Sequence, residues 1–184
     1  IGAGAIGGWL AAVLSRGGAE VALLARGATL AALRSSGLTL IEGERRATFE
    51  FAASDRAADL ATPDAVVLAV KTNGFADAVA DAADAFRHGP LVVTAMNGLP
   101  WWFLSGLQGP LNDQRLESVD PGGRAASMLS HVRPLGAVVH ASTKAESPGV
   151  IRVAVVDRLI LGEPDGTASP ETAARDFIRI ATWD

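Results

Sequence analysis

Three runs of mainly apolar residues mark the expected strands of this chain. They lie at residues 20–25, 63–70 and 91–95, and within each run the apolar residues are continuous rather than alternating with polar ones. Continuous hydrophobicity is typical of strands that are buried on both faces, as in parallel sheets. The pattern therefore predicts parallel strands covered by other elements on both sides.

Residues 74–87, between the second and third runs, have the pattern of an amphipathic helix. The apolar stripe at helical spacing is formed by Phe75, Val79, Ala82 and Phe86, and the acids available for the solvent side are Asp77, Asp81 and Asp84. A repeat of strand, helix and strand predicts a parallel sheet with right-handed connections. We expect an α/β fold of the Rossmann type, with a doubly wound, mainly parallel sheet.

Later segments predict that one edge of this sheet is mixed. Two pairs of strand-like runs are each joined by a short turn, namely 38–41 with 48–51 across Gly43 to Arg46, and 135–141 with 150–156 across Pro148-Gly149. Both pairs are expected to be antiparallel. The stretch 106–134 is rich in Gly, Pro, Asp and Ser, which predicts an excursion at the sheet edge with one short helix near 125–130.

The composition narrows the class of protein. The chain has 184 residues, of which 49% are hydrophobic and 20% charged, as in one globular domain with room for an appendage. A net charge of -4 argues against a nucleic-acid surface. The chain has no cysteine, and no apolar run approaches the roughly 18 to 20 residues of a membrane span. We expect a soluble, cytoplasmic protein without membrane or nucleic-acid partners.

The two ends of the sequence have the appearance of cut ends. The chain begins with Ile1 rather than methionine, and only this residue remains of the strand that should precede a glycine motif. Near Pro170 an apolar-periodic segment begins, which stops at Trp183-Asp184 without a capping glycine or polar tail. We therefore expect an incomplete first strand and more protein beyond the last residue.

The first residues form a motif that favours dinucleotide binding. The motif is Gly2-Ala3-Gly4-Ala5-Ile6-Gly7. Its first glycine permits a tight turn, its second lets a pyrophosphate approach the backbone, and its third lets the helix pack closely on the strand. Alone this motif is weak, but a predicted helix over 9–16 and a strand over 21–25 follow at the spacing of a mononucleotide-binding unit.

Arg26 follows the second strand, at the position where NAD-binding folds carry an acid for the ribose hydroxyls. An arginine at this point suits the 2′-phosphate of NADP(H), because its planar fork is always charged. The alternative is a solvated surface arginine. The missing acid also argues against a methyltransferase, whose ribose favours a carboxylate there.

Two polar residues close the next two strands. Lys71 follows the strand that ends at Val70, and Asn97 follows the third strand and precedes Gly98. Ligands of open parallel sheets bind beyond the carboxyl ends of the strands, so both side chains are candidates for the cofactor crevice. The alternatives are a lysine that extends along the surface to solvent and a turn-forming Asn-Gly pair.

Other candidates for chemistry are weaker. The three histidines, His88, His131 and His140, have no metal-ligand spacing, and we predict no metal site. The aromatic run Trp101-Trp102-Phe103 is a core-packing feature or a wall of a substrate cleft, and core packing is favoured. The acids between Asp113 and Asp120 are assigned to the surface.

Taken together, these motifs resemble the ketopantoate reductase family. The resemblance rests on GAGAIGG at the start, Val70-Lys71-Thr72, Met96-Asn97-Gly98, Leu99-Pro100-Trp101-Trp102-Phe103, Val119-Asp120-Pro121-Gly122-Gly123 and Leu161-Gly162-Glu163-Pro164. It implies NADPH-dependent reduction of 2-dehydropantoate, a small 2-oxo acid, to pantoate on the way to pantothenate. It also implies an NADP-binding domain over residues 1–168 and a helix over 169–184 that leads toward a helical domain not contained in the sequence.

The resemblance also implies roles for individual residues. The motif at residues 2–7 would hold the pyrophosphate, Arg26 the 2′-phosphate, and Lys71 and Asn97 the nicotinamide and catalytic side of the cleft. Ser142 falls where a backbone contact to the cofactor is expected. The proton donor is expected beyond the last residue, so the chain alone would bind NADPH but have little activity, and a homodimer is the assembly to test.

Three alternatives stay open at this point. The segment between Asn97 and residue 135 is longer than in compact members of the family. This difference leaves open whether the substrate is 2-dehydropantoate or another branched 2-oxo acid. Hydroxyisobutyrate and glycerol-phosphate dehydrogenases share the glycine motif, although the Asn-Gly-Leu-Pro-Trp-Trp run argues against them. A nucleotide-sensing domain without chemistry is the third, and it has no need of Lys71 and Asn97 together.

Overall fold

The computed structural model describes residues 1–164. The predicted terminal helix over 169–184 and the domain boundary at 168 lie outside the described residues. The strands are β1 (Ala22–Leu24), β2 (Leu38–Glu42), β3 (Arg45–Phe49), β4 (Ala52–Ser54), β5 (Ala65–Leu68), β6 (Leu91–Thr94), β7 (Arg133–Ser147) and β8 (Val150–Gly162). The α-helices are α1 (Ala5–Arg16), α2 (Gly27–Ser36), α3 (Phe75–Asp81), α4 (Ala83–Phe86) and α5 (Arg124–Met128). Short 3₁₀ turns are η1 (Ala57–Asp59), η2 (Thr72–Gly74) and η3 (Pro121–Gly123).

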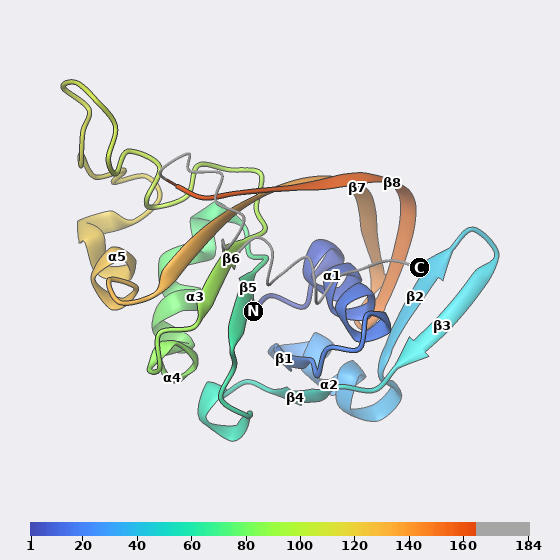
Figure 1. Ribbon diagram of the computed structural model, residues 1–184. Helices are drawn as coiled ribbons and strands as arrows, with labels where there is room; N and C mark the ends of the chain where they lie inside the picture. Colours follow the sequence, from blue (N-terminus) through green and yellow to red (C-terminus); the bar gives the residue numbers. More distant parts are fainter. Residues whose placement is uncertain (165–184) are drawn as a thin grey trace.

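The strands form a mainly parallel sheet with a mixed edge, as the sequence predicts. Six strands follow the order β3-β2-β8-β7-β6-β5, and β1 pairs with β4 in a separate two-stranded unit. The pairs β1 with β4, β2 with β8, β5 with β6 and β6 with β7 are parallel. Within residues 1–164, only the hairpins β2–β3 and β7–β8 are antiparallel. The second hairpin is longer than predicted and runs across the molecule as a long ribbon (Figure 1).

The first two residues join the two groups of strands. The N–H of Ala69 donates to the carbonyl of Ile1 at 3.0 Å, and the N–H of Gly2 donates to the carbonyl of Leu24 at 3.3 Å. The amine of Ile1 donates to the carbonyl of Val67 at 2.7 Å, and burial lowers the pKa of this amine to about 6. Ile1 and Gly2 therefore lie between β1 and β5, where the prediction puts the first strand.

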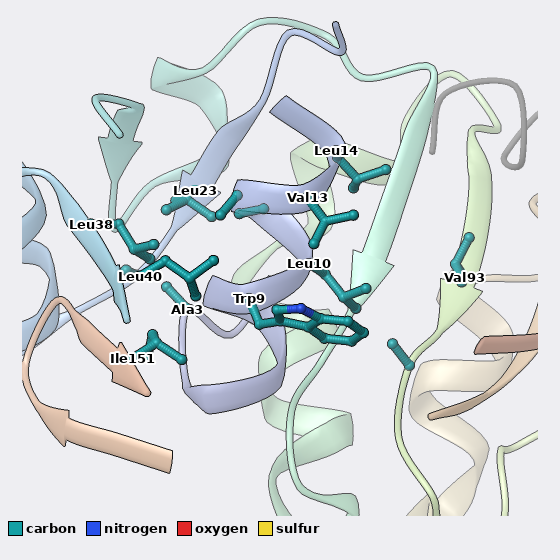
Figure 2. Close-up of a cluster of buried hydrophobic side chains, with 14 of the residues drawn as sticks. Ala3, Trp9, Leu10, Val13, Leu14, Leu23, Leu38, Leu40, Val93 and Ile151 are labelled. Carbon is teal, nitrogen blue, oxygen red and sulfur yellow. The ribbon is translucent and has the colours of Figure 1, made fainter. Parts of the chain in front are cut away.

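Helices cover both faces of the sheet, so the fold is doubly wound. One core cluster contains α1 together with Leu91 and Val93 of β6, and the other contains α3 and α5 together with Val92 of the same strand. Successive strand residues point to opposite faces, so β6 is buried from both sides. Figure 2 shows Trp9, Leu10 and other side chains of α1 in the first cluster.

The crossover between β5 and β6 differs from its prediction. The four predicted stripe residues are all buried, namely Phe75, Val79, Ala82 and Phe86. However, the expected single helix is divided into α3 and α4, because Ala82 has φ -103° and ψ 17°. The structure also contains β4 and α2, which the sequence analysis did not assign.

Candidate functional site

The turn between Gly2 and Gly7 has the close packing that its glycines predict. Gly2 has φ +90°, and a Cβ there would lie 2.9 Å from the carbonyl oxygen of Ala69. A Cβ on Gly7 would collide with the carbonyl oxygen of Gly2. The first and third glycines are therefore required by backbone conformation and by contact between helix and strand. We call residues 2–7 the glycine turn.

Gly4 is the glycine of this turn that faces open space. No atom lies within 4 Å of a Cβ built on Gly4, and this residue is the N-cap of α1. The first turn of α1 contains Ala5, Ile6 and Gly7 and has no acidic side chain. The first N–H groups of a helix lack acceptors within the helix and carry partial positive charge. The arrangement can therefore bind an anion such as a phosphate.

A cavity of about 390 Å³ lies beside the glycine turn at the ends of the strands. We call it the strand-end cavity. Its lining residues are Ile1, Gly2, Ala3, Gly4, Leu24, Ala25, Arg26, Thr29, Asp55, Ala69, Val70, Lys71, Gly74, Ala78 and Asp81. Its volume lies within the range of about 300 to 1,000 Å³ that is usual for small-molecule sites. The fold thus brings the first half of the glycine turn together with two cations far apart in sequence.

Arg26 lines this cavity as the N-cap residue of α2, two residues after the end of β1. Its side chain is 74% exposed, and one of its guanidinium nitrogens lies 3.1 Å from a carboxylate oxygen of Asp81. Arg26 therefore lies at the surface, as the alternative of a solvated arginine predicts, and it also lines the cavity, as a role in phosphate binding requires. Asp81, which the sequence analysis assigned to solvent, is its partner.

Lys71 lines the same cavity from the end of β5, where it is the N-cap residue of η2. Its side chain is exposed and has no hydrogen bond or ion pair with the part of the chain that the structure describes. Lys71 is therefore available to an anionic or carbonyl oxygen in the cavity. With Arg26, Asp55 and Asp81, it makes the ionisable lining of the cavity neutral overall.

Asn97 follows β6 but does not line the strand-end cavity. Its side-chain amide donates to the carbonyl of Val139 and accepts from the N–H of Val139, both at 2.9 Å. An amide carries two N–H donors and two acceptor lone pairs, so one of each remains. A Cβ added to the neighbouring Gly98 would collide with the hydroxyl oxygen of Thr72, so the loop after β6 lies against the loop after β5.

Ser142 is also separate from the strand-end cavity. It lies on β7 opposite Val155 of β8, and its side chain is exposed. Register shifts flank it, between His140 and Ala141 and between Ser142 and Thr143. The structure therefore places Ser142 in an irregular part of the β7–β8 hairpin and not beside Arg26 or Lys71.

Sequence reasoning missed three polar residues of the cavity: Thr29, Asp55 and Asp81. Asp55 directly follows β4, a strand of three residues without a hydrophobic pattern, so no strand end was predicted there. Asp81 could have been found only by knowing that the end of α3 approaches the end of β1. In both cases the residue reaches the cavity through the three-dimensional arrangement of the elements, which the local sequence does not reveal.

Among the remaining candidates, Trp101 contributes to packing, whereas Phe103 is 45% exposed. Asp120, which the sequence analysis assigned to the surface, is buried. Trp101 stacks on Phe75 with ring centroids 5.4 Å apart, which confirms the core interpretation for this tryptophan. A ring nitrogen of His131 lies 2.7 Å from the carbonyl oxygen of Phe86.

Within residues 1–164, no group of three or more His, Cys, Asp or Glu side chains could hold a metal ion. In the same range, no helix has both the length and the apolar character that crossing a membrane requires.

The chain is similar to known ketopantoate reductases. The family model for ketopantoate reductase PanE/ApbA matches residues 1–166. A 2-dehydropantoate 2-reductase from Mesorhizobium japonicum is 40% identical over 197 aligned residues, which cover 99% of this chain and 60% of that protein. The chain therefore spans less than two thirds of the length of this curated relative.

Solved structures show the same likeness. A structure from Ralstonia solanacearum MolK2 that carries the name ketopantoate reductase superposes with a TM-score of 0.87 at 45% identity, over 97% of this chain and 55% of that one. A PanE/ApbA family ketopantoate reductase from Ralstonia eutropha JMP134 has a TM-score of 0.71 at 23% identity, over 97% and 51% of the two chains, and supports the fold alone. Because the family match covers most of the sequence and the curated relative aligns with nearly all of it, this chain belongs to the ketopantoate reductase PanE/ApbA family.

Proposed function

We propose that this chain is the cofactor-binding part of an NADPH-dependent reductase that converts 2-dehydropantoate to pantoate. The strand-end cavity carries the proposal, because it joins the glycine turn, Arg26 and Lys71 in one space. The M. japonicum relative bears the name of this reaction. Since the chain spans 60% of that relative, part of the substrate site is expected to come from residues outside this chain.

The glycine turn would bind the pyrophosphate of the cofactor. Gly4 faces open space, so a phosphate can approach the backbone closely. The residues of the first helical turn, Ala5, Ile6 and Gly7, offer N–H groups at the positive end of α1. Gly2 and Gly7 keep this end of the helix against the sheet, so the N–H groups are held in position before the cofactor binds.

Arg26 would bind the 2′-phosphate, at the adenosine end of the cavity. Its guanidinium can offer several N–H groups to phosphate oxygens, and charge-assisted bonds of this kind are about twice as strong as neutral ones. The adjoining Ala25 is apolar, and no acid precedes or follows Arg26 directly in the sequence. The residue that follows the predicted second strand is therefore a cation, which suits a phosphate.

Lys71 and Asn97 would serve the nicotinamide side, and Ser142 would add a backbone contact. When bound, NADPH supplies the hydride that is transferred to the C2 carbonyl carbon, while a proton completes the new hydroxyl group. Lys71 has no partner among the described residues, so its charge can stabilise the carbonyl oxygen as it becomes negative. The remaining N–H of Asn97 is oriented by the two bonds to Val139. The proton donor is expected outside this chain, which alone would have little activity.

The decisive test is cofactor titration of the intact protein with Arg26→Ala. We expect the parent to bind NADPH more tightly than NADH. The substitution should weaken the affinity for NADPH by about 10- to 100-fold, because it removes a charged hydrogen-bonding partner worth about 1.5 to 3 kcal/mol. NADH affinity should stay within about two-fold, since NADH lacks the phosphate. Calorimetric titration measures both constants. Equal affinity of the parent for both cofactors would disprove the phosphate role.

The substrate is tested separately, by NADPH oxidation with a panel of 2-oxo acids. We expect 2-dehydropantoate to give the highest kcat/KM. Turnover of another branched 2-oxo acid with none of 2-dehydropantoate would replace the proposed substrate and keep the reaction type. The absence of turnover with every acid, despite NADPH binding, would favour a nucleotide-sensing role.

A further inference from the structure

The partner of Arg26 in the strand-end cavity is a carboxylate from a distant part of the chain. Arg26 and Asp81 are 55 residues apart, and the pair connects the end of β1 to the end of α3 at 3.1 Å. Both side chains line the cavity and are largely exposed, at 74% for Arg26 and 58% for Asp81. The pair is thus accessible to a ligand that enters the cavity.

The stability of α3 does not explain an acid at this position. Asp81 is the last residue of the helix, where the macrodipole disfavours negative charge. The other acid of α3, Asp77, lies in the first turn, where negative charge is favourable. An exposed ion pair contributes little to folding on average. The contact with Arg26 is therefore better explained by an effect on the cavity than by an effect on the helix.

We propose that Asp81 is a specificity-determining residue that competes with the 2′-phosphate of NADPH for Arg26. This inference rests on the proposed function, because it requires a phosphate at Arg26. In the structure one guanidinium nitrogen of Arg26 donates to a carboxylate oxygen of Asp81. A phosphate that approaches the same fork meets a like charge beside it, so binding of NADPH exchanges one anionic partner for another.

NADH would be affected differently, because it brings no phosphate to Arg26. NADH leaves the pair of Arg26 with Asp81 unchanged, whereas the phosphate of NADPH must share the guanidinium with the carboxylate and is repelled by its charge. Asp81 therefore lowers the preference for NADPH below the value that Arg26 alone would give. Asp55 also lines the cavity and adds a second negative charge, but it has no hydrogen bond or ion pair within the described residues.

The test is Asp81→Asn in the intact protein, titrated with NADPH and NADH. We expect NADPH affinity to rise by about two- to five-fold, the range for an exposed ion pair, and NADH affinity to stay within about two-fold. The gain should shrink at high salt, because exposed charges are screened. A matched control is Asp84→Asn, since Asp84 pairs with Arg87 at 2.6 Å but does not line the strand-end cavity. This control removes the same charge and should change neither affinity.

The double variant Arg26→Ala with Asp81→Asn completes the experiment. If Asp81 acts through Arg26, the gain from Asp81→Asn disappears once the arginine is absent. Weaker binding of NADPH by Asp81→Asn would show that the carboxylate positions Arg26 for the phosphate. Unchanged binding would show that Asp81 has no role in cofactor binding. Either result overturns the proposal that Asp81 competes with the phosphate. A loss of NADPH affinity in Arg26→Ala alongside one of these results leaves the proposed function standing. No effect of Arg26→Ala refutes the phosphate role and the inference together.

Discussion

The two walls of the strand-end cavity are built in different ways. The glycine turn is a backbone structure, in which Gly2 and Gly7 are held by contacts that admit no side chain. The opposite wall presents Arg26 and Lys71, two exposed side chains, of which one pairs with Asp81 and the other has no partner among the described residues. The first wall is fixed by folding, whereas the second can adjust to its ligand.

This difference separates two kinds of residue at the site. A change of Gly2 or Gly7 acts on the fold first and on binding as a consequence. A change of Arg26 or Lys71 removes a charge from the cavity but breaks no buried contact. The comparison therefore predicts that substitution of Gly2 or Gly7 lowers both stability and cofactor affinity. Substitution of Arg26 or Lys71 should lower cofactor affinity and leave stability nearly unchanged.

The largest effect is expected from Gly7→Ala. The added methyl group would collide with the carbonyl oxygen of Gly2, so α1 must move away from the sheet. Overpacking of this kind costs about 1 to 3 kcal/mol or more. Because α1 carries a large part of the core, including Trp9 and Leu10, the shift should also misplace its first N–H groups. Denaturant unfolding should show the loss of stability, and NADPH titration a loss of affinity of more than about ten-fold.

Gly4→Ala is the matched control on the same turn. Gly4 has φ -84°, and a methyl group there meets no atom within 4 Å. Because alanine is less favourable than glycine at an N-cap, stability should fall by up to about 1 kcal/mol, less than for Gly7→Ala. The methyl group would nevertheless stand where the pyrophosphate approaches, so NADPH affinity should fall. If Gly7→Ala were as stable as the parent, the fixed character of the glycine turn would be refuted.

The glycine turn was also the part of the site that the sequence predicted best. The requirement of Gly2 for positive φ and of Gly7 for close contact is local, so spacing in the sequence carries it. The continuous apolar runs likewise predicted β1, β5 and β6, because burial on both faces leaves no polar alternation. Element type and order were confirmed for these strands.

What the sequence did not predict depends on distant neighbours or on weak local signals. The strand β4 consists of Ala52, Ala53 and Ser54, which have no strand pattern, and its partner β1 supplies the pairing. The break at Ala82 interrupts a sequence of good helix formers, so propensity gave no sign of it. The pair of Arg26 with Asp81 depends on how β1 and α3 approach each other, which neither segment encodes by itself.

Asn97 shows why position at a strand end does not by itself assign a side chain to the adjustable wall. Regular pairing of β6 with β7 ends at Thr94 opposite Gly136. Three residues later the amide of Asn97 donates to and accepts from the backbone of Val139, as a peptide group of a further strand residue would. In sequence Asn97 resembled Lys71, but in the structure it extends the ladder and belongs with the fixed parts of the site.

Asn97→Ala should therefore lower stability, by a smaller amount than Gly7→Ala. It removes both bonds and leaves the N–H and the carbonyl of Val139 without this partner, which costs about 1 to 2 kcal/mol. Lys71→Ala is the control at the neighbouring strand end, and it should leave the free energy of unfolding within about 0.5 kcal/mol because no described residue pairs with Lys71. Denaturant unfolding of both variants measures the contrast. Equal stability of Asn97→Ala and the parent would refute the structural role of these two bonds and leave only binding and catalysis to explain Asn97.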